Sequence, residues 1–241
     1  MIEGTKLVIN HLVLDEFRTS EDTCTLYCPG FKQLEEPQKY KTTNDVDNLL
    51  PKLFNDINET YYQINYSGMG GSGGEFSFLN SLDDGLVACE YLLKHFKKVN
   101  LICRGWGAIV GSYALSKFCE QLGNIILLTP YCFIPGRDRV EHLLNGMLTG
   151  NFMALKKEDS DYYLEEIEEI RSKYSFIENV INIMDRKVFI IAATKDKIIP
   201  IQILRETTSM LKNRKYFEVN QGHDLERPQE IEEIIKQIIT P

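Results

Sequence analysis

The sequence predicts an α/β fold, in which a mostly parallel sheet of about eight strands carries helices on both faces. Strand-length apolar runs alternate with helix-length segments along most of the 241 residues. Strands separated by helices pair in parallel and are covered on both sides, with right-handed crossovers. Hydrophobic residues make up 43% of the chain and charged residues 26%, a composition typical of a globular domain. With no repeat, low-complexity tract or linker in view, we expect a single domain over residues 1–241.

The N-terminal part of the chain is expected to form strands and one helix. KLVINHLVLDEF (6–17) predicts one long strand or a hairpin. CTLYCPGF (24–31) predicts a strand that ends in a Pro-Gly turn, and YYQINYSG (61–68) predicts another strand. Between these two, residues 43–58 suit a helix whose apolar side carries Val46, Leu49, Leu50, Leu53 and Phe54.

The rest of the chain continues the alternation. In order we expect a helix over 80–97, a strand over 99–104, a helix over 107–121, strands over 124–130 and 187–193, a helix over 201–212, a strand over 214–219 and a helix over 229–239. Pro228 starts the last helix, because proline is well tolerated at the first helical position. The inward face of that helix carries Ile231, Ile234, Ile235 and Ile238.

One segment, residues 131–186, interrupts the alternation because most of it has no strand pattern. Its stretch DYYLEEIEEIRSKYSFIENVIN has acidic residues opposite a series of apolar residues at helical spacing, namely Leu164, Ile167, Ile170, Tyr174, Ile177 and Ile181. We therefore expect a small helical cap over the strand ends. For part of the segment, an ordinary crossover helix is the alternative.

Composition argues against several classes of partner and cofactor. The formal net charge is −8, and no Lys/Arg cluster offers a basic face for nucleic acid or anionic lipid. No apolar run approaches the roughly 20 residues of a membrane span, and the N-terminus lacks a signal-peptide pattern, so we expect a cytoplasmic protein. The six cysteines lie mostly in apolar runs without CxxC pairs, and the four histidines are isolated, which predicts reduced core thiols and no metal site.

A glycine loop, YSGMGGSGGEF, follows the strand over 61–68 and has the G-x-G-x-x-G spacing at Gly68, Gly70 and Gly73. A dinucleotide fingerprint needs a helix that starts inside this loop, because the helix N-terminus holds the pyrophosphate. Here the helical pattern begins only near Asn80, and no G-K-[ST] sequence is present. We therefore expect no nucleotide cofactor.

The sequence VNLICRGWGAIVGSYAL (99–115) passes from an apolar strand through a glycine turn into an apolar helix. This succession is typical of the G-x-S-x-G nucleophile elbow, whose turn exposes a serine at the edge of a sheet. Residues 103–107 read Cys-Arg-Gly-Trp-Gly, so a glycine stands at the apex. Further on, VFIIAATKDKIIP ends a strand with Asp196 in its loop, and VNQGHDL places His223 in a glycine turn.

In this order and at these distances, the motifs resemble those of the α/β-hydrolase family, which includes serine esterases, thioesterases and peptidases. The resemblance covers nearly the whole chain. LYCPGF is similar to the family's oxyanion strand, with Pro29 where histidine is usual. INYSGMGGSGGEFSFLNSLDDGLVACEYL is similar to the family's glycine loop and following helix.

The resemblance implies roles for five residues. Asp196 matches the acid that orients the general base, His223, and Gly105 stands at the position of the nucleophile. The backbone N–H groups of Phe31 and Trp106 match the two donors that stabilise the oxyanion of a tetrahedral intermediate. Because glycine has no nucleophilic side chain, the family's covalent acyl-enzyme cannot form as usual.

Three classes of function stay open. The first is an ester or thioester hydrolase or acyl-transfer enzyme whose serine was removed to trap a ligand. The second is an enzyme that uses His223 and Asp196 without a covalent intermediate. The third class is a non-catalytic binding or scaffold protein that kept a degenerate triad and works through a protein partner. Cys103, which replaces the first glycine of the elbow, is either a substitute thiol nucleophile or a buried inert residue.

The insertion is expected to line a cleft above Gly105 that suits an acyl-containing small molecule. Arg104, beside the apex, is expected to face the surface or the cap, where it or Arg137 could meet a negative group. The alternative is that the apolar side chains simply pack the cap onto the core. The residues concerned are Phe133, Leu144, Met147, Phe152 and Met153.

Overall fold

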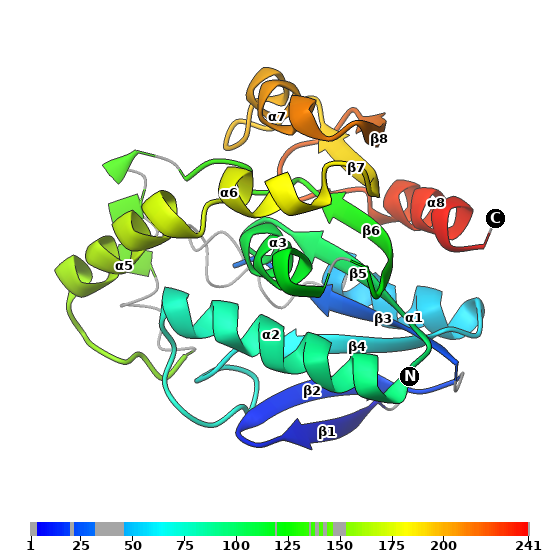
Figure 1. The fold of residues 1–241 in the computed structure, drawn as a ribbon, viewed down its shortest axis with the longest axis horizontal. Coiled ribbons are helices and arrows are strands. Elements are labelled where there is room, and N and C mark those ends of the chain that lie inside the picture. The colour runs from blue at the N-terminus through cyan, green and yellow to red at the C-terminus, as the bar shows by residue number, and fades with distance from the viewer. Residues whose placement is uncertain are drawn as a thin grey trace.

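The computed structural model describes residues 4–19, 22–31, 46–118, 120–134, 136–137, 140–141, 144–146 and 153–240 (Figure 1). One eight-stranded sheet runs through the molecule in the order β1-β2-β4-β3-β5-β6-β7-β8. The strands are β1 (Thr5–Ile9), β2 (Leu12–Phe17), β3 (Thr23–Cys28), β4 (Thr60–Asn65), β5 (Lys98–Arg104), β6 (Leu122–Leu128), β7 (Lys187–Ala193) and β8 (Asn213–Val219). From β4 to β8 all neighbours are parallel, whereas β1 and β2 run antiparallel to theirs. The predicted fold class is confirmed.

The segment over 6–17 is a hairpin, the second of the two predicted possibilities. Ile9 of β1 pairs with Leu12 of β2, so only Asn10 and His11 remain for the turn. Asn10 has φ +58°, and asparagine adopts this left-handed conformation more readily than most residues do. The segment is therefore two strands joined by a two-residue turn, and not one continuous strand.

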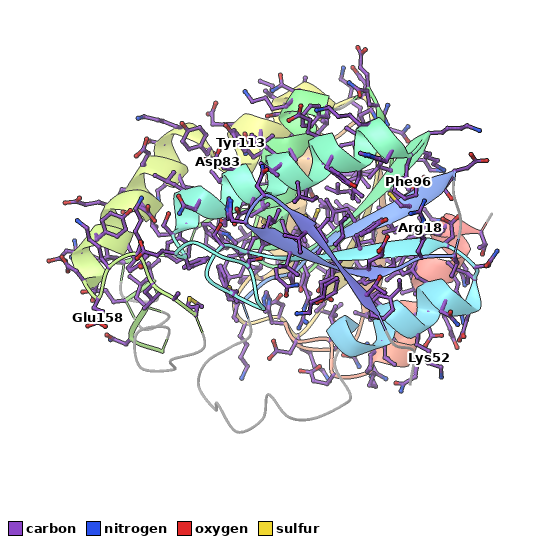
Figure 2. All side chains as sticks on the ribbon, turned by 90° about the horizontal axis from the view of Figure 1, so that it is seen from below. Arg18, Lys52, Asp83, Phe96, Tyr113 and Glu158 are labelled. Atoms are coloured by element: carbon purple, nitrogen blue, oxygen red, sulfur yellow. The ribbon has the colours of Figure 1, made fainter. Side chains whose placement is uncertain are left out.

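Helices cover both faces of the sheet. Figure 2 shows Lys52 of α1 on one side of it, and Asp83 of α2 and Tyr113 of α3 together on the other. α8 packs against α1, and α6 packs against α3. The helices whose bounds the structure describes are α1 (Val46–Asp56), α2 (Phe78–His95), α3 (Gly107–Phe118), α5 (Ser160–Lys173), α6 (Phe176–Val180), α7 (Ile201–Thr207) and α8 (Pro228–Ile239), with short 3₁₀ turns at Ile181–Ile183 and Thr208–Met210.

The central strands are buried on both sides, which is why they read as unbroken apolar runs. In β5, Leu101 and Cys103 belong to the core under α2 and α3, whereas Ile102 between them belongs to the core under α1 and α8. The same alternation holds in β7, where Ile190 faces the first core and Ile191 the second. The period of two in a strand thus divides one apolar run between two cores.

Helix α2 begins earlier than its apolar pattern predicted. Ser77 is its N-cap and accepts a hydrogen bond from the backbone N–H of Asn80. The carboxylate of Glu166 accepts a bond from the N–H of Phe78 at 2.8 Å. Both acceptors bond backbone N–H groups that the first turn of a helix leaves without a partner. Such capping bonds cannot be predicted from hydrophobic periodicity, which is why the predicted start was too late.

The two described helices of the insertion after β6, α5 and α6, pack against different parts of the molecule. α5 packs against α2, and its Glu166 caps the N-terminus of α2, which follows the carboxyl end of β4 (Figure 1). α6 instead packs along α3, as a crossover helix does. The expected cap over the strand ends stays a prediction, since residues 135, 138–139, 142–143 and 147–152 lie outside the described residues.

Among the described glycines, Gly107, the first residue of α3, is the one at which an added β-carbon would come closest to another atom. A β-carbon there would lie 1.9 Å from the carbonyl oxygen of Cys28. We expect Gly107→Ala to lower the free energy of unfolding, measured in urea, by about 1–3 kcal/mol, which is the usual cost of overpacking.

The matched control is Gly136→Ala, since a β-carbon at Gly136 would meet no described atom within 4 Å. The control should change the free energy of unfolding by no more than about 0.5 kcal/mol, as exposed substitutions usually do. Equal effects of the two substitutions would contradict the packing described for Gly107.

Candidate active site

A sharp turn joins β5 to α3, with Gly105 at its apex. Gly105 has φ +50°, in the left-handed region that glycine adopts without strain. Its N–H donates to the carbonyl of Leu128 at the end of β6, and its carbonyl accepts from the N–H of Tyr131 at 3.0 Å. The turn is therefore held on the neighbouring strand, at the carboxyl edge of the sheet.

The loop after β3 lies directly on this turn. A β-carbon at Gly30 would be 2.9 Å from the carbonyl oxygen of Arg104 and 3.3 Å from the backbone nitrogen of Trp106. The next residue, Phe31, places its ring 5.8 Å from that of Trp106, measured between centroids. Within the described part of the chain, the backbone N–H groups of Phe31 and Trp106 donate to no acceptor. Two neighbouring backbone donors are thus available at the elbow.

His223 and Asp196 form a close pair at the same edge. Nδ1 of His223 lies 2.8 Å from Oδ2 of Asp196, and both side chains are buried, at 10% and 2% exposure. The other carboxylate oxygen accepts from the N–H groups of Ile198 and Ile199, each at 2.8 Å. An ionised carboxylate bonded in this way holds the proton of the imidazole on Nδ1, which leaves Nε2 as the free acceptor.

Tyr131 connects this pair to the elbow. Its ring meets that of His223 edge to face, with 5.6 Å between centroids. A β-carbon at Gly105 would lie 3.5 Å from the same tyrosine ring, an ordinary van der Waals contact. The hydroxyl of Thr129 donates to the carbonyl of His223 at 3.1 Å. The sequence analysis missed both Thr129 and Tyr131. A signal was present, because both directly follow β6, the parallel neighbour of β5, and the carboxyl ends of parallel strands meet at one edge of the sheet.

Comparison with known proteins gives a clear result only for the fold. No family model matches the chain, and no curated protein is significantly similar to it. Est1E from Butyrivibrio proteoclasticus has a TM-score of 0.67 at 14% identity, over 98% of this chain and 97% of that one. The mouse α/β-hydrolase domain-containing protein 10 has a TM-score of 0.66 at 14% identity, over 99% and 98%. The esterase Pf2001 from Pyrococcus furiosus has a TM-score of 0.65 at 14% identity, over 99% and 90%.

The chain has the α/β-hydrolase fold. The strand order, the antiparallel second strand and the turn between β5 and α3 all agree with the resemblance drawn from the motifs. In this sheet, the turn with Gly105 follows β5, Asp196 lies in the loop after β7, and His223 lies in the loop after β8. None of the described helices has the length and apolar character that crossing a bilayer requires.

The sequence analysis expected Arg104 to face the surface or the cap, and this expectation is wrong. Its side chain is 8% exposed, and its guanidinium donates to the carbonyl oxygen of Asp224 at 3.2 Å. The reason is its place at the end of β5, where the alternation of the strand turns the side chain towards the loop after β8. By contrast, Arg137 is exposed and pairs with Glu141 at 2.7 Å.

The described part of the expected apolar lining packs largely into the core. Leu144 is fully buried, Met153 is nearly so, and Phe133 is half-buried against the same core. Met147 and Phe152 lie outside the described residues. For Leu144 and Met153 the structure therefore favours the packing alternative.

Cys103 lies within the core under α3. Its side chain is fully buried, and a β-carbon at Gly111 would lie 2.2 Å from its Sγ. The pKa of the neighbouring Cys28 thiol is raised well above its usual range by its hydrogen bond with the Cys103 side chain and by burial. Burial also raises the pKa of the Cys89 thiol. The complete burial of Cys103 favours its inert interpretation, because a nucleophilic cysteine has to be accessible to its substrate.

The burial of these thiols predicts protection from alkylation. At pH 8, iodoacetamide should leave Cys28, Cys89 and Cys103 unmodified in the folded protein and modify all three after unfolding in urea. Peptide mapping by mass spectrometry gives the result for each cysteine separately. Rapid modification of Cys103 in the folded protein would reopen its assignment as a substitute nucleophile.

Proposed function

We propose that the protein is a hydrolase-like enzyme of the ester or thioester class with a degenerate triad, in which His223 activates water directly. The observation that carries the proposal is the buried Asp196 carboxylate, with one oxygen on His223 and the other on two backbone N–H groups. A buried carboxylate is stable only when it is fully hydrogen-bonded. Such a pair holds the imidazole in one orientation, as general-base catalysis requires.

The proposed reaction has two steps. Nε2 of His223 takes a proton from water while the water oxygen bonds to the acyl carbon, and the carbonyl becomes an oxyanion. The N–H groups of Phe31 and Trp106 stabilise that charge, which is worth most in a site that excludes water. The tetrahedral intermediate then collapses, and the imidazolium returns its proton to the leaving alcohol or thiol. No bond to the protein forms at Gly105.

Support for the substrate class comes from the fold and from two aromatic rings. The rings of Phe31 and Trp106, whose backbone N–H groups are the proposed oxyanion donors, pack against each other with 5.8 Å between centroids, which supports a substrate with an apolar acyl part. The similar Est1E has also been solved with ferulic acid bound, and the similar Pf2001 is an esterase. We therefore propose a small acyl ester or thioester as the substrate.

A non-catalytic binding protein is the second candidate. It is supported by the glycine at the elbow apex and by the packing of Leu144 and Met153 into the core rather than into a cleft. In that case His223 and Asp196 would orient a ligand or a protein partner without turnover.

Turnover of p-nitrophenyl esters, acyl thioesters and feruloyl esters distinguishes the two candidates. Removing the proposed base by His223→Gln should lower kcat/KM by about 10²–10⁴-fold, the usual contribution of general acid–base catalysis. The matched control is His95→Gln, since His95 is exposed at the end of α2. No turnover above the buffer rate by the parent chain, or equal rates in parent and His223→Gln, would favour the binding protein.

Installing the serine tests the register of the site. Gly105→Ser should become labelled by a fluorophosphonate probe, because a serine there, although strained at φ +50°, has room for its β-carbon, whose nearest contact is an ordinary one at 3.5 Å. The parent chain should stay unlabelled, and Gly105→Ser combined with His223→Gln should lose the labelling. Mass spectrometry locates the modified residue, and labelling of the parent at another serine would overturn the assignment of Gly105.

A further inference from the structure

We propose that Arg104, together with Thr129, is a positioning residue that holds the backbone of His223 at the elbow. The inference rests on the proposed function, because it assigns a role towards the proposed base. It concerns the histidine loop, defined here as residues 220–227, and the ends of β5 and β6. Neither Arg104 nor Thr129 is assigned a contact with substrate.

Two successive carbonyls of the histidine loop accept bonds from the two strand ends. The hydroxyl of Thr129, directly after β6, donates to the carbonyl of His223 at 3.1 Å. Nη2 of Arg104, the last residue of β5, donates to the carbonyl of Asp224 at 3.2 Å and lies 3.7 Å from its carboxylate. Two successive peptides, those that begin with the His223 and Asp224 carbonyls, are therefore bonded to the ends of β6 and β5.

The burial of Arg104 makes this contact costly to lose. Its side chain is 8% exposed, whereas that of Asp224 is 49% exposed. A buried guanidinium needs hydrogen-bond acceptors, since an uncompensated charge in the interior is strongly unfavourable. The loop also has an anchor of its own in Leu225, which is fully buried in the core under α1 and α8. Arg104 adds a restraint at Asp224, the residue directly after the proposed base.

Other bonds fix the two ends of the loop. The side chain of Gln221 donates to Glu230 and accepts from the N–H of Arg227, both at 2.7 Å. The carbonyl of Gln221 accepts from the N–H of Lys195 at 2.9 Å. These contacts attach residues 221 and 227 to α8 and to the loop after β7 that carries Asp196. The middle of the loop, where the base lies, is where Arg104 and Thr129 act.

This arrangement couples the base to the elbow. Arg104 immediately precedes Gly105, and Thr129 lies two residues before Tyr131, whose N–H bonds to the carbonyl of Gly105. Asp196 sets the direction of the imidazole, while Arg104 and Thr129 set the position of its backbone. A displacement of about 1 Å in a reacting group can cost about 100-fold in rate, so such anchoring has a measurable consequence.

The test uses the full chain labelled with ¹⁵N-histidine, and follows the Nδ1–H signal of His223 and its pH titration by NMR. Arg104→Met and Thr129→Val should broaden, split or abolish this signal and shift the titration. Arg104→Lys and Thr129→Ser keep a donor and should restore the parent spectrum wholly or in part. The matched control, Arg137→Met, removes an exposed arginine and should leave the signal unchanged.

Kinetics give a second readout if the chain turns over an ester. Arg104→Met should then lower kcat at least 10-fold with little change in KM, because the substrate contacts remain. In the Gly105→Ser background, the same substitution should slow fluorophosphonate labelling to a similar degree. If Arg104→Met fails to fold, Thr129→Val against Thr129→Ser carries the comparison alone.

The outcomes separate this inference from the proposed function. A changed His223 signal in Arg104→Met or Thr129→Val supports positioning, even if no ester is hydrolysed and the function fails. Folded variants with parent-like His223 spectra and titration would overturn the positioning role, even if turnover shows the protein to be a hydrolase.

Discussion

The contact between the loop after β3 and the turn after β5 is the constraint on which the candidate site depends. β3 and β5 are neighbours in register, with Cys28 opposite Cys103. Phe31 and Trp106 each follow three residues later, and their rings lie 5.8 Å apart between centroids. This proximity requires glycines where the two backbones touch, because a β-carbon at Gly107 would lie 1.9 Å from a carbonyl oxygen.

The acid–base pair depends on the order of the remaining strands. β5, β6, β7 and β8 are consecutive in the sheet and all parallel, so their carboxyl ends form one continuous edge. Asp196 follows β7 and His223 follows β8, and the two meet at 2.8 Å although they are 27 positions apart. Thr129, after β6, fills the position between this pair and the elbow. The site is thus a property of the sheet edge rather than of any one loop.

The insertion joins this edge through an aromatic cluster. The ring of Phe78, at the start of α2, packs at a tilt against Trp106 with 4.8 Å between centroids, and edge to face against Tyr163 of α5 with 5.9 Å between centroids. Glu166 of the same helix caps α2 through the N–H of Phe78. The N-terminus of α2, the elbow and α5 therefore share one set of contacts.

The sequence by itself determined the succession of strands and helices, the elbow with Gly105 at its apex, and the loops that carry Asp196 and His223. These features are local: apolar periodicity, glycine turns and proline positions are readable within short windows. Only the tertiary structure decided that Arg104 turns to the histidine loop, that Thr129 and Tyr131 join the site, and that α6 packs along α3. The physical reason is that these depend on contacts between distant residues, since Arg104 and the Asp224 carbonyl it bonds are 120 positions apart.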